Sequence, residues 1–265
     1  MNVLITGVAF GIGQAVTKHF VQCGHTVYGI DLAKTESSGN FHGYVADITD
    51  EDSLQNVRKH LLENNVTLDV ILNIAGIHMM ASLVESDYDK MKKVVDVNLS
   101  GAILVNRVFY DCLAAYGRIV IVTSEVAAFA PMPFNGLYNV TKTALDAYAQ
   151  ALRQELNLLG QKVITIRPGA VETDLSTASM KATQQLADTT VLYKKQARSF
   201  AGLAAKFMGK PIKAQALATL IYKATTAKNP KLIYRKHQNM GLVLLSILPK
   251  RTQCAVIKLL LRLKW

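Results

Sequence analysis

Tyr138 and Lys142 are the residues whose types and spacing could move a proton. They stand four positions apart, and residues 144–152 are rich in helix formers and contain neither Gly nor Pro, so a helix is predicted that places both side chains on one face. A free phenol titrates near ~10, and a neighbouring ammonium lowers that pKa because it stabilises the phenolate. Many helices carry a Tyr and a Lys at this spacing by chance, facing solvent. The pair therefore indicates an active site only if a cofactor site and a polar partner lie upstream.

A glycine-rich turn near the start of the chain predicts the cofactor site. Residues 2–6 have the pattern of a short apolar strand, and the turn is followed by a helical pattern that ends at Gly24. Glycines in this context permit a close approach of the backbone to a pyrophosphate, and the N-terminus of the helix offers free N–H groups. A plain turn between strand and helix is the alternative, but the flanking elements favour a dinucleotide site. The predicted contacts in the turn are Gly7, Phe10, Gly11, Ile12 and Gly13.

Asp31 ends the second predicted strand, residues 26–30, and indicates which dinucleotide binds. An acid at this point can accept hydrogen bonds from the ribose hydroxyls of adenosine and would repel a 2′-phosphate. The alternative is an Asp in a solvated loop, but its position at the strand end favours a function. Lys34 is the only basic residue near it, and the glycine turn contains none. The sequence therefore predicts NAD(H) in preference to NADP(H).

A third predicted strand, about residues 42–46, follows a short polar loop. Residues 32–40 form that loop, so the helix expected between the second and third strands is predicted to be missing or reduced. Asp47 follows the strand and could contact adenine, with Ile48 beside it as a further cofactor contact.

The fourth predicted strand, residues 68–76, is a nearly continuous apolar run, which is typical of buried parallel strands. At its end, Asn73 could hold neighbouring backbone. The small residues Ala75 and Gly76 would let a cofactor lie close.

Two further polar positions are candidates for the chemistry. Asn98 lies in an apolar stretch of a long helix predicted over residues 86–114, and a buried Asn needs hydrogen-bond partners. It is either a structural residue that distorts the helix or part of a proton path. A fifth predicted strand, residues 118–124, delivers Ser124 at its carboxyl end, where open α/β sheets place their ligands.

Alternating strands and helices predict the fold class. A sixth strand is predicted over residues 162–167, and a helix over 214–227 with a strand near 232–234 should complete the sheet. This order predicts an α/β fold, a doubly wound parallel sheet of the Rossmann-like kind with helices on both faces. No repeat, low-complexity tract or linker interrupts it, so a single domain over residues 1–265 is expected.

Composition sets further bounds. Cys23, Cys112 and Cys254 lack the spacing of a metal site and are expected to be reduced thiols in a cytoplasmic protein, and no metal is predicted. The first residues do not have the pattern of a signal peptide. Charge is uneven along the chain: residues 1–188 hold fourteen Lys and Arg and all nineteen Asp and Glu, whereas residues 189–265 hold sixteen basic residues and no acidic one.

The motifs described above, in the order in which they follow one another along the chain, resemble those of the short-chain dehydrogenase/reductase family over about residues 2–175. The resemblance implies that Tyr138 is the general acid/base. It implies that Lys142 binds the nicotinamide ribose and lowers the pKa of Tyr138, that Asn98 helps to hold a water in a proton relay, and that Thr173 contacts the nicotinamide carboxamide. It also implies a homo-oligomer, either a dimer or a tetramer. The remaining cofactor contacts in the carried-over motifs are Asp47, Asn73, Ala75, Gly76, Pro168, Gly169 and Val171.

The sequence departs from the family pattern at one catalytic position. The family's serine usually stands about thirteen residues before the tyrosine, where this chain has Glu125. A carboxylate is a poor donor to a substrate carbonyl. The serine role is therefore assigned to Ser124, with a one-residue shift in the loop 125–137.

The substrate is expected to be a hydrophobic small molecule. Residues 174–213 correspond to the part that caps the substrate in this family, and residues 78–80 and 131–134 would line the same cleft with His, Met and Phe side chains. The pattern of residues 131–138 is similar to the 17β-hydroxysteroid-dehydrogenase-like branch. A secondary alcohol or its ketone, such as a hydroxysteroid, is expected. A retinoid or an acylated lipid ketone is one alternative, and a dinucleotide-binding sensor or scaffold without turnover is another.

Residues 239–265 form a basic amphipathic segment that Pro249 interrupts. Neither half approaches the ~20 apolar residues of a membrane span. Such a segment can lie on an anionic bilayer as a peripheral contact, or it can form a helix packed on the core or on another subunit. Nucleic acid is not expected as a partner, because the segment has few aromatic side chains that could stack on bases.

Overall fold

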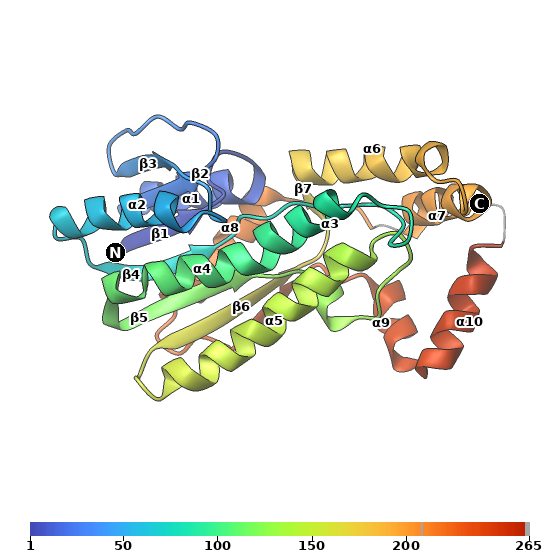
Figure 1. Cartoon of the computed structure of the whole chain (residues 1–265). Coiled ribbons are helices and arrows are strands. Elements are labelled where there is room, and N and C mark those ends of the chain that lie inside the picture. Colours follow the sequence, from blue (N-terminus) through green and yellow to red (C-terminus); the bar gives the residue numbers. More distant parts are fainter. Residues whose placement is uncertain (208, 263–265) are drawn as a thin grey trace.

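Seven parallel strands form the central sheet of the protein (Figure 1). The computed structural model describes residues 1–207 and 209–262. The strand order is β3-β2-β1-β4-β5-β6-β9, so the chain reverses its direction of progression across the sheet between β1 and β4. This switch point is where doubly wound sheets bind ligands. The strands are β1 (Asn2–Thr6), β2 (Thr26–Asp31), β3 (Phe41–Val45), β4 (Leu68–Asn73), β5 (Leu113–Val122), β6 (Lys162–Pro168) and β9 (Ile233–Lys236).

Helices cover both faces of this sheet, which confirms the predicted fold class. On β1, Val3 and Ile5 join the apolar cluster beneath α1 and α8, whereas Leu4 joins the cluster beneath α2, α4 and α5. The alternation follows from the two-residue period of a strand, and burial on both sides explains why the strands are continuous apolar runs. The helices are α1 (Gly11–Gln22), α2 (Glu51–Glu63), α4 (Gly101–Val108), α5 (Gly136–Asn157) and α8 (Ala214–Thr226).

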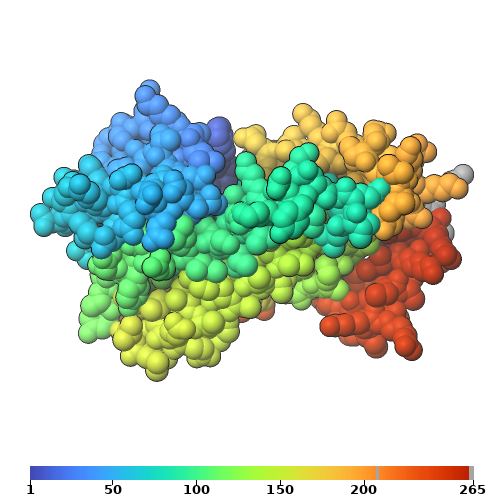
Figure 2. Space-filling view, viewed as in Figure 1, coloured from blue at the N-terminus to red at the C-terminus, as the bar shows by residue number. Residues whose placement is uncertain are grey.

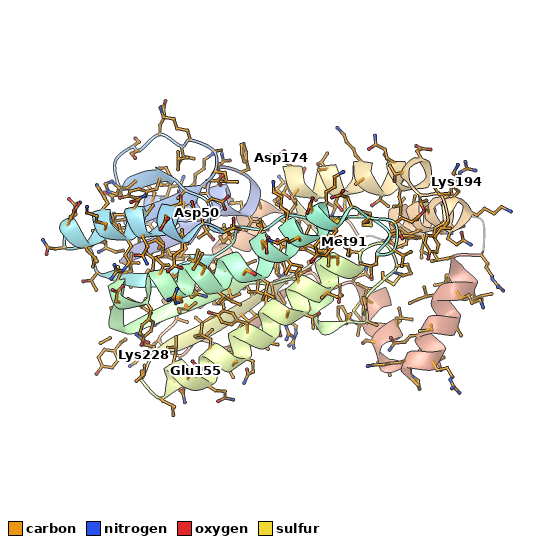
Figure 3. The ribbon with its side chains drawn as sticks, viewed as in Figure 1. Asp50, Met91, Glu155, Asp174, Lys194 and Lys228 are labelled. Atoms are coloured by element: carbon orange, nitrogen blue, oxygen red, sulfur yellow. The ribbon has the colours of Figure 1, made fainter. Side chains whose placement is uncertain are left out.

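The loop predicted between β2 and β3 is confirmed, because residues 32–40 contain no helix. Helix α2 begins after Asp50, whose carboxylate accepts a hydrogen bond from the Asp52 N–H at 3.1 Å and caps the helix (labelled in Figure 3). Acidic side chains in this first turn interact favourably with the positive end of the helix dipole and stabilise the helix. The local sequence is therefore sufficient to fix where α2 starts.

The prediction of one long helix over residues 86–114 is wrong in two respects: a π-helical turn interrupts the helix, and the helix ends before residue 114. The chain forms α3 (Tyr88–Val95), a π-helical turn at Asp96–Ser100, α4, and a short 3-10 turn before β5. Strand β5 begins at Leu113 rather than at residue 118, and Leu113 pairs with Leu68 of β4 ahead of a register shift. Tertiary pairing along the sheet thus overrides the helix propensity of the intervening Leu and Ala residues.

Two helices form a lid beside the carboxyl end of the sheet. The lid comprises α6 (Asp174–Thr189) and α7 (Lys194–Phe207), and Figure 3 labels the residue at which each of them begins. Strands β7 (Val171–Glu172) and β8 (Ile212–Lys213) pair in parallel and bracket this segment. Glu85 holds the connection between the two helices, because its carboxylate accepts hydrogen bonds from the N–H groups of Val191 and Leu192 at 2.7 and 2.9 Å.

Two more helices, α9 (Met240–Ile247) and α10 (Lys250–Leu260), project beside the lid and are drawn in red in Figures 1 and 2. We call them the C-terminal hairpin. They are separated at Pro249, as the sequence predicts. No helix within the described residues has the length and apolar character needed to cross a bilayer.

Candidate active site

A cavity of about 780 Å³ opens at the carboxyl ends of β5 and β6. It runs from the inferred cofactor side, at Ile12 and Gly76, to the lid and the C-terminal hairpin. Its size is within the usual range of small-molecule sites, and most of its lining residues are apolar. The predicted site residues that line it are Ile12, Gly76, Ser124, Tyr138, Lys142, Pro168, Gly169, Val171 and Thr173.

Tyr138 and Lys142 lie on consecutive turns of α5 and both face this cavity. The Ser124 hydroxyl, at the end of β5, hydrogen-bonds the Tyr138 phenol. The Lys142 ammonium lies 5.9 Å from the centre of the Tyr138 ring and donates to the Val122 carbonyl at 3.3 Å. The structure therefore brings together Ser124, Tyr138 and Lys142, three of the four side chains that the sequence predicts for the proton transfer.

Burial is the main cause of the pKa shifts of Tyr138 and Lys142. It raises the pKa of Tyr138 to about 12, although the hydrogen bond from Ser124 acts in the opposite direction. Burial also lowers the pKa of Lys142 to about 8, because the charged ammonium loses its hydration. The net shift of the Tyr138 pKa is therefore upward, because burial is its largest cause.

Asn98 lies within the π-helical turn and is 1% exposed. Its side-chain amide accepts a hydrogen bond from the Ile77 N–H at 2.8 Å and donates to the Ile77 carbonyl at 2.9 Å. It also donates to the Thr141 hydroxyl at 3.2 Å, which in turn donates to the Tyr138 carbonyl at 2.9 Å. Asn98 thus connects the loop after β4 to the helix that carries Tyr138.

Glu125 contacts the start of the C-terminal hairpin. Its carboxylate accepts a hydrogen bond from the backbone N–H of Asn239 at 2.6 Å, and the Asn239 side chain caps α9. Burial raises the pKa of Glu125. The residue that replaces the family's serine therefore anchors the hairpin, while Ser124 occupies the position next to the phenol.

His78 is also part of the site. The sequence analysis placed it in the substrate cleft but did not name it as a catalytic or cofactor-binding residue. Its ring centre lies 4.5 Å from that of Tyr138, and its pKa is lowered by burial despite a hydrogen bond with Asn135. The neutral imidazole is thus favoured next to the phenol. Its position two residues after Gly76 was the available signal.

The glycine turn has the geometry that a dinucleotide requires. Gly7 has a φ of 78°, and a Cβ there would lie 2.9 Å from the Ala75 Cα. A Cβ on Gly13 would lie 1.8 Å from the Gly7 carbonyl oxygen. Helix α1 starts at Gly11 with no side-chain cap and no acid in its first turn, so its free N–H groups and dipole can receive a pyrophosphate. These residues fit the pyrophosphate of a dinucleotide, which is the type of cofactor that the glycine turn predicts.

Asp31 ends β2 and turns its carboxylate towards this turn. Its two oxygens accept hydrogen bonds from the N–H groups of Ala9 and Ala33, at 2.9 and 3.0 Å. The carboxylate thus fixes the turn and keeps a negative charge at the strand end. Asp47 follows β3 and caps its own loop, accepting from the Thr49 N–H at 2.8 Å.

Two residues predicted as cofactor contacts, Ile48 and Asn73, have side chains that are buried in the protein interior. Ile48 is buried in the core against Gly101 of α4, where a Cβ on that glycine would lie 2.9 Å from the Ile48 Cδ1. Asn73 is buried and donates to the Asn106 side chain at 2.8 Å. The end of β4 is held instead by the Thr6 hydroxyl, which accepts from the N–H groups of Ile74 and Ala75. The signal for Thr6 in the sequence is its position directly before Gly7 at the end of β1.

On the other side of the turn, Thr173 caps α6 in a reciprocal arrangement with Ser176. A Cβ on Gly11 would lie 3.2 Å from the Thr173 side chain, so the glycine turn and the start of the lid are in close contact. The lid therefore begins at the same place as the cofactor helix, and its position depends on that contact.

A dinucleotide turn and a Tyr–Ser–Lys set at the carboxyl edge of a doubly wound sheet define a nicotinamide-dependent oxidoreductase. Residues 1–184 match the short chain dehydrogenase family, and the chain belongs to that family. It is an oxidoreductase acting on an alcohol or a carbonyl group.

Named relatives and a solved structure agree with this membership. An NADPH-dependent 1-acyldihydroxyacetone phosphate reductase of Schizosaccharomyces pombe is 35% identical over 180 residues, which cover 65% of this chain and 60% of that protein. A serine 3-dehydrogenase of Agrobacterium fabrum is 30% identical over 201 residues, covering 73% of this chain and 80% of that protein. A short chain dehydrogenase family protein from Francisella tularensis superposes with a TM-score of 0.73 at 26% identity, covering 88% and 96% of the two chains.

We predict that Ser124→Ala lowers kcat/KM about 100-fold or more, because it removes the hydroxyl that can donate to the substrate oxygen. Glu125→Gln is the matched control, since the amide oxygen can still accept from the Asn239 N–H. It should change kcat/KM less than about threefold. Steady-state kinetics on any ketone that the enzyme reduces would measure both. Full activity in Ser124→Ala, or its loss only in Glu125→Gln, would contradict the assignment of the serine role.

We predict that Lys142→Met raises the free energy of unfolding at pH 7 by up to about 3 kcal/mol, because a buried ammonium is costly. The pKa of Lys142 is lowered from 10.5 to about 8 on folding, so the cost is complete below pH 8 and disappears as the pH rises to 10.5. Urea unfolding at several pH values would measure the gain and its decline. Lys59→Met, an exposed lysine on α2, is the control and should change stability by less than about 0.5 kcal/mol. A loss of stability in Lys142→Met would refute this account of the site.

Proposed function

We propose that the protein is an NAD(H)-dependent oxidoreductase that interconverts a hydrophobic secondary alcohol and its ketone. The observation that carries this proposal is the Tyr138 phenol, hydrogen-bonded by Ser124 and close to the buried Lys142, in a cavity with mostly apolar walls. A cofactor-binding sensor would not need a phenol and a hydroxyl that converge on the same open space.

The residues divide the reaction between them. When it is bound, a nicotinamide dinucleotide supplies or accepts the hydride at the substrate carbon. In the direction of reduction, the Ser124 hydroxyl donates a hydrogen bond to the carbonyl oxygen, and the Tyr138 Oη delivers the proton to it. In the direction of oxidation, Tyr138 takes that proton back. Lys142 is positioned to place a positive charge near the ribose and the phenol, which favours the phenolate.

For the cofactor, we favour NAD(H) over NADP(H). The Asp31 carboxylate stands at the end of β2, and its hydrogen bonds with the Ala9 and Ala33 N–H groups fix it where the adenosine ribose would lie. A 2′-phosphate there would meet a negative charge. The Schizosaccharomyces pombe relative carries NADPH in its name, so the two dinucleotides have to be compared directly.

For the substrate, the cavity supports two classes of hydrophobic ketone. Its apolar walls, lid and volume suit the flat skeleton of a hydroxysteroid, which is the class favoured by the pattern of residues 131–138, or a retinoid. An acylated lipid ketone is the second candidate. Two observations favour the acylated lipid ketone. Apolar side chains of the C-terminal hairpin extend the cavity, and the Schizosaccharomyces pombe relative is named as a 1-acyldihydroxyacetone phosphate reductase.

We further propose a cytoplasmic homo-oligomer. All three cysteines are free thiols, which fits a reducing compartment. Ile103 on α4 and Val140 on α5 are exposed apolar side chains, 37% and 53% accessible, on the helices through which oligomers of this family are expected to form. Sedimentation velocity would measure the assembly.

We predict that hydride transfer from NADH to ketones in a panel of steroids, retinal and acylated lipid ketones is lost about 1,000-fold or more in Tyr138→Phe. Because the pKa of Tyr138 is raised to about 12 and Lys142, with a pKa of about 8, stays charged, reduction should be insensitive to pH from 6 to 7. Oxidation needs the phenolate, so its kcat/KM should rise with pH over this range. Absorbance at the nicotinamide band would follow both. A Tyr138→Phe variant that retains turnover would exclude Tyr138 as the acid/base.

We predict that the protein binds NADH more tightly than NADPH, and that Asp31→Asn strengthens NADPH binding about tenfold while it alters NADH binding less. Asn keeps the shape of the side chain and one acceptor, so the change tests the charge. Asp69→Asn, at the amino end of β4, removes the same charge far from the cofactor turn and is the control. Fluorescence titration of the three proteins with both dinucleotides would give the six dissociation constants. Tighter binding of NADPH by the unmodified protein would overturn the preference for NAD(H).

A further inference from the structure

The outer surface of α9 carries a row of exposed apolar side chains. Met240, Leu244 and Ile247 are 65%, 64% and 74% exposed, and their spacing places them along one face of the helix. No residue of α9 is buried. A row of this kind on a short helix, close to the opening of a cavity, indicates a surface with a binding partner.

Helix α10 has an apolar inner face and a basic outer face. Val256 and Leu260 line the cavity on the inside. Arg251, Lys258 and Leu259 are exposed on the outside, with Leu259 61% accessible. This is the pattern of a helix that lies at the boundary between lipid headgroups and hydrocarbon.

The charges around the hairpin have a single sign. Within the described residues of the hairpin, 239–262, the charged side chains are Lys250, Arg251, Lys258 and Arg262, and none is acidic. A protein partner normally has both positive and negative charges on its surface. A surface that is complementary to such a partner would therefore contain acidic as well as basic residues. A surface of cations and exposed hydrocarbon without acids instead complements an anionic bilayer, which attracts basic side chains and accepts apolar ones.

The acidic part of a second copy of this chain is the competing partner. Several of its exposed acids are already paired within the chain: Asp111 with Arg58, and Glu51 with Arg107 at 2.9 Å. At the tip of the lid, the Glu85 carboxylate binds the connection between α6 and α7, so the lid tip does not have charges of a single sign. We therefore confine the surface to the C-terminal hairpin.

The hairpin is held on the core in a defined orientation. Glu125 accepts from the Asn239 N–H at 2.6 Å, and the buried Gln253 side chain donates to the Leu248 carbonyl at 2.7 Å. These bonds fix the start of α9 and the junction with α10. The exposed row on α9 is thus presented without a further ordering step, which reduces the entropic cost of binding.

The same helix forms the rim of the cavity. Leu242 and Leu245 line the cavity, and Leu244 and Leu248 line it while they remain exposed to solvent. A surface in contact with α9 therefore lies next to the cavity opening.

We propose that the C-terminal hairpin docks on the surface of an anionic lipid bilayer, with the exposed row of α9 among the acyl chains and the basic residues of α10 at the headgroups. Docking places the cavity opening at the boundary of the hydrocarbon, where a membrane-dissolved substrate can enter without passing through water. The docking itself does not depend on the proposed reaction, whereas the delivery of substrate rests on it.

The test is co-sedimentation of the full-length protein with vesicles of phosphatidylcholine alone and with about one quarter phosphatidylserine. We expect binding to the anionic vesicles only, and its loss when the salt is raised from about 0.1 M to about 1 M. Lys250→Glu with Arg251→Glu should weaken the binding about tenfold or more. Met240→Ser with Ile247→Ser, which changes exposed side chains that do not line the cavity, should also weaken it about tenfold or more.

The matched control is Lys228→Glu with Lys231→Glu, which makes the same change in net charge. Lys228 is labelled in Figure 3 and lies at the end of the molecule opposite the hairpin (α10 in Figure 1). This variant should bind anionic vesicles within about threefold of the unmodified protein.

Equal binding to both kinds of vesicle, no binding to either, or the same loss in the control variant would each overturn the proposal. A change of oligomeric state in Met240→Ser with Ile247→Ser, with no vesicle binding by the unmodified protein, would assign this surface to a second copy of the chain. Vesicle binding by a protein that reduces no ketone would support the docking and contradict only the proposed reaction.

Discussion

The buried ammonium of Lys142 beside the Tyr138 phenol is the constraint on which the site depends. Taking a charge and a phenol out of water is costly, and the shifted pKa values of about 8 and about 12 express that cost. The structure offsets it with few direct contacts, chiefly the Val122 carbonyl and the Ser124 hydroxyl. The carboxyl ends of β4 and β5 and the first turns of α5 are arranged to hold these groups, and the apolar sheet provides the rigidity that keeps them together.

Much of this arrangement can be predicted from the sequence, because it is encoded locally. The glycine turn follows from residues whose missing side chains are required by the backbone at Gly7 and Gly13. The doubly wound sheet follows from apolar runs separated by helical patterns, and the missing helix between β2 and β3 follows from a polar loop. Ser124 could be preferred to Glu125 on chemical grounds alone, since a hydroxyl can donate and a carboxylate cannot.

The remaining features depend on contacts between distant residues. The π-helical turn around Asn98 is satisfied by Ile77 and Thr141, which no local pattern reveals. Strand β5 starts early because Leu113 pairs with Leu68, and Ile48 joins the core because Gly101 leaves room for it. The partner of Glu125 is Asn239, more than one hundred residues away in the sequence, so the sequence shows an anomaly there but not its structural role. The direction of the Tyr138 pKa shift likewise depends on burial, which only the folded chain determines.

The central claim is that this cavity transfers a hydride to a carbonyl carbon while Tyr138 moves the proton. Its most direct test is a single turnover of NADH carrying deuterium at C4 of the nicotinamide, in both stereochemical forms, with hydrophobic ketones and mass analysis of the product. We predict that one of the two forms places deuterium on the carbinol carbon, and that the Tyr138→Phe variant binds the same NADH without transferring deuterium. Tight binding of NADH with no deuterium in any product, or equal transfer by Tyr138→Phe, would contradict the claim.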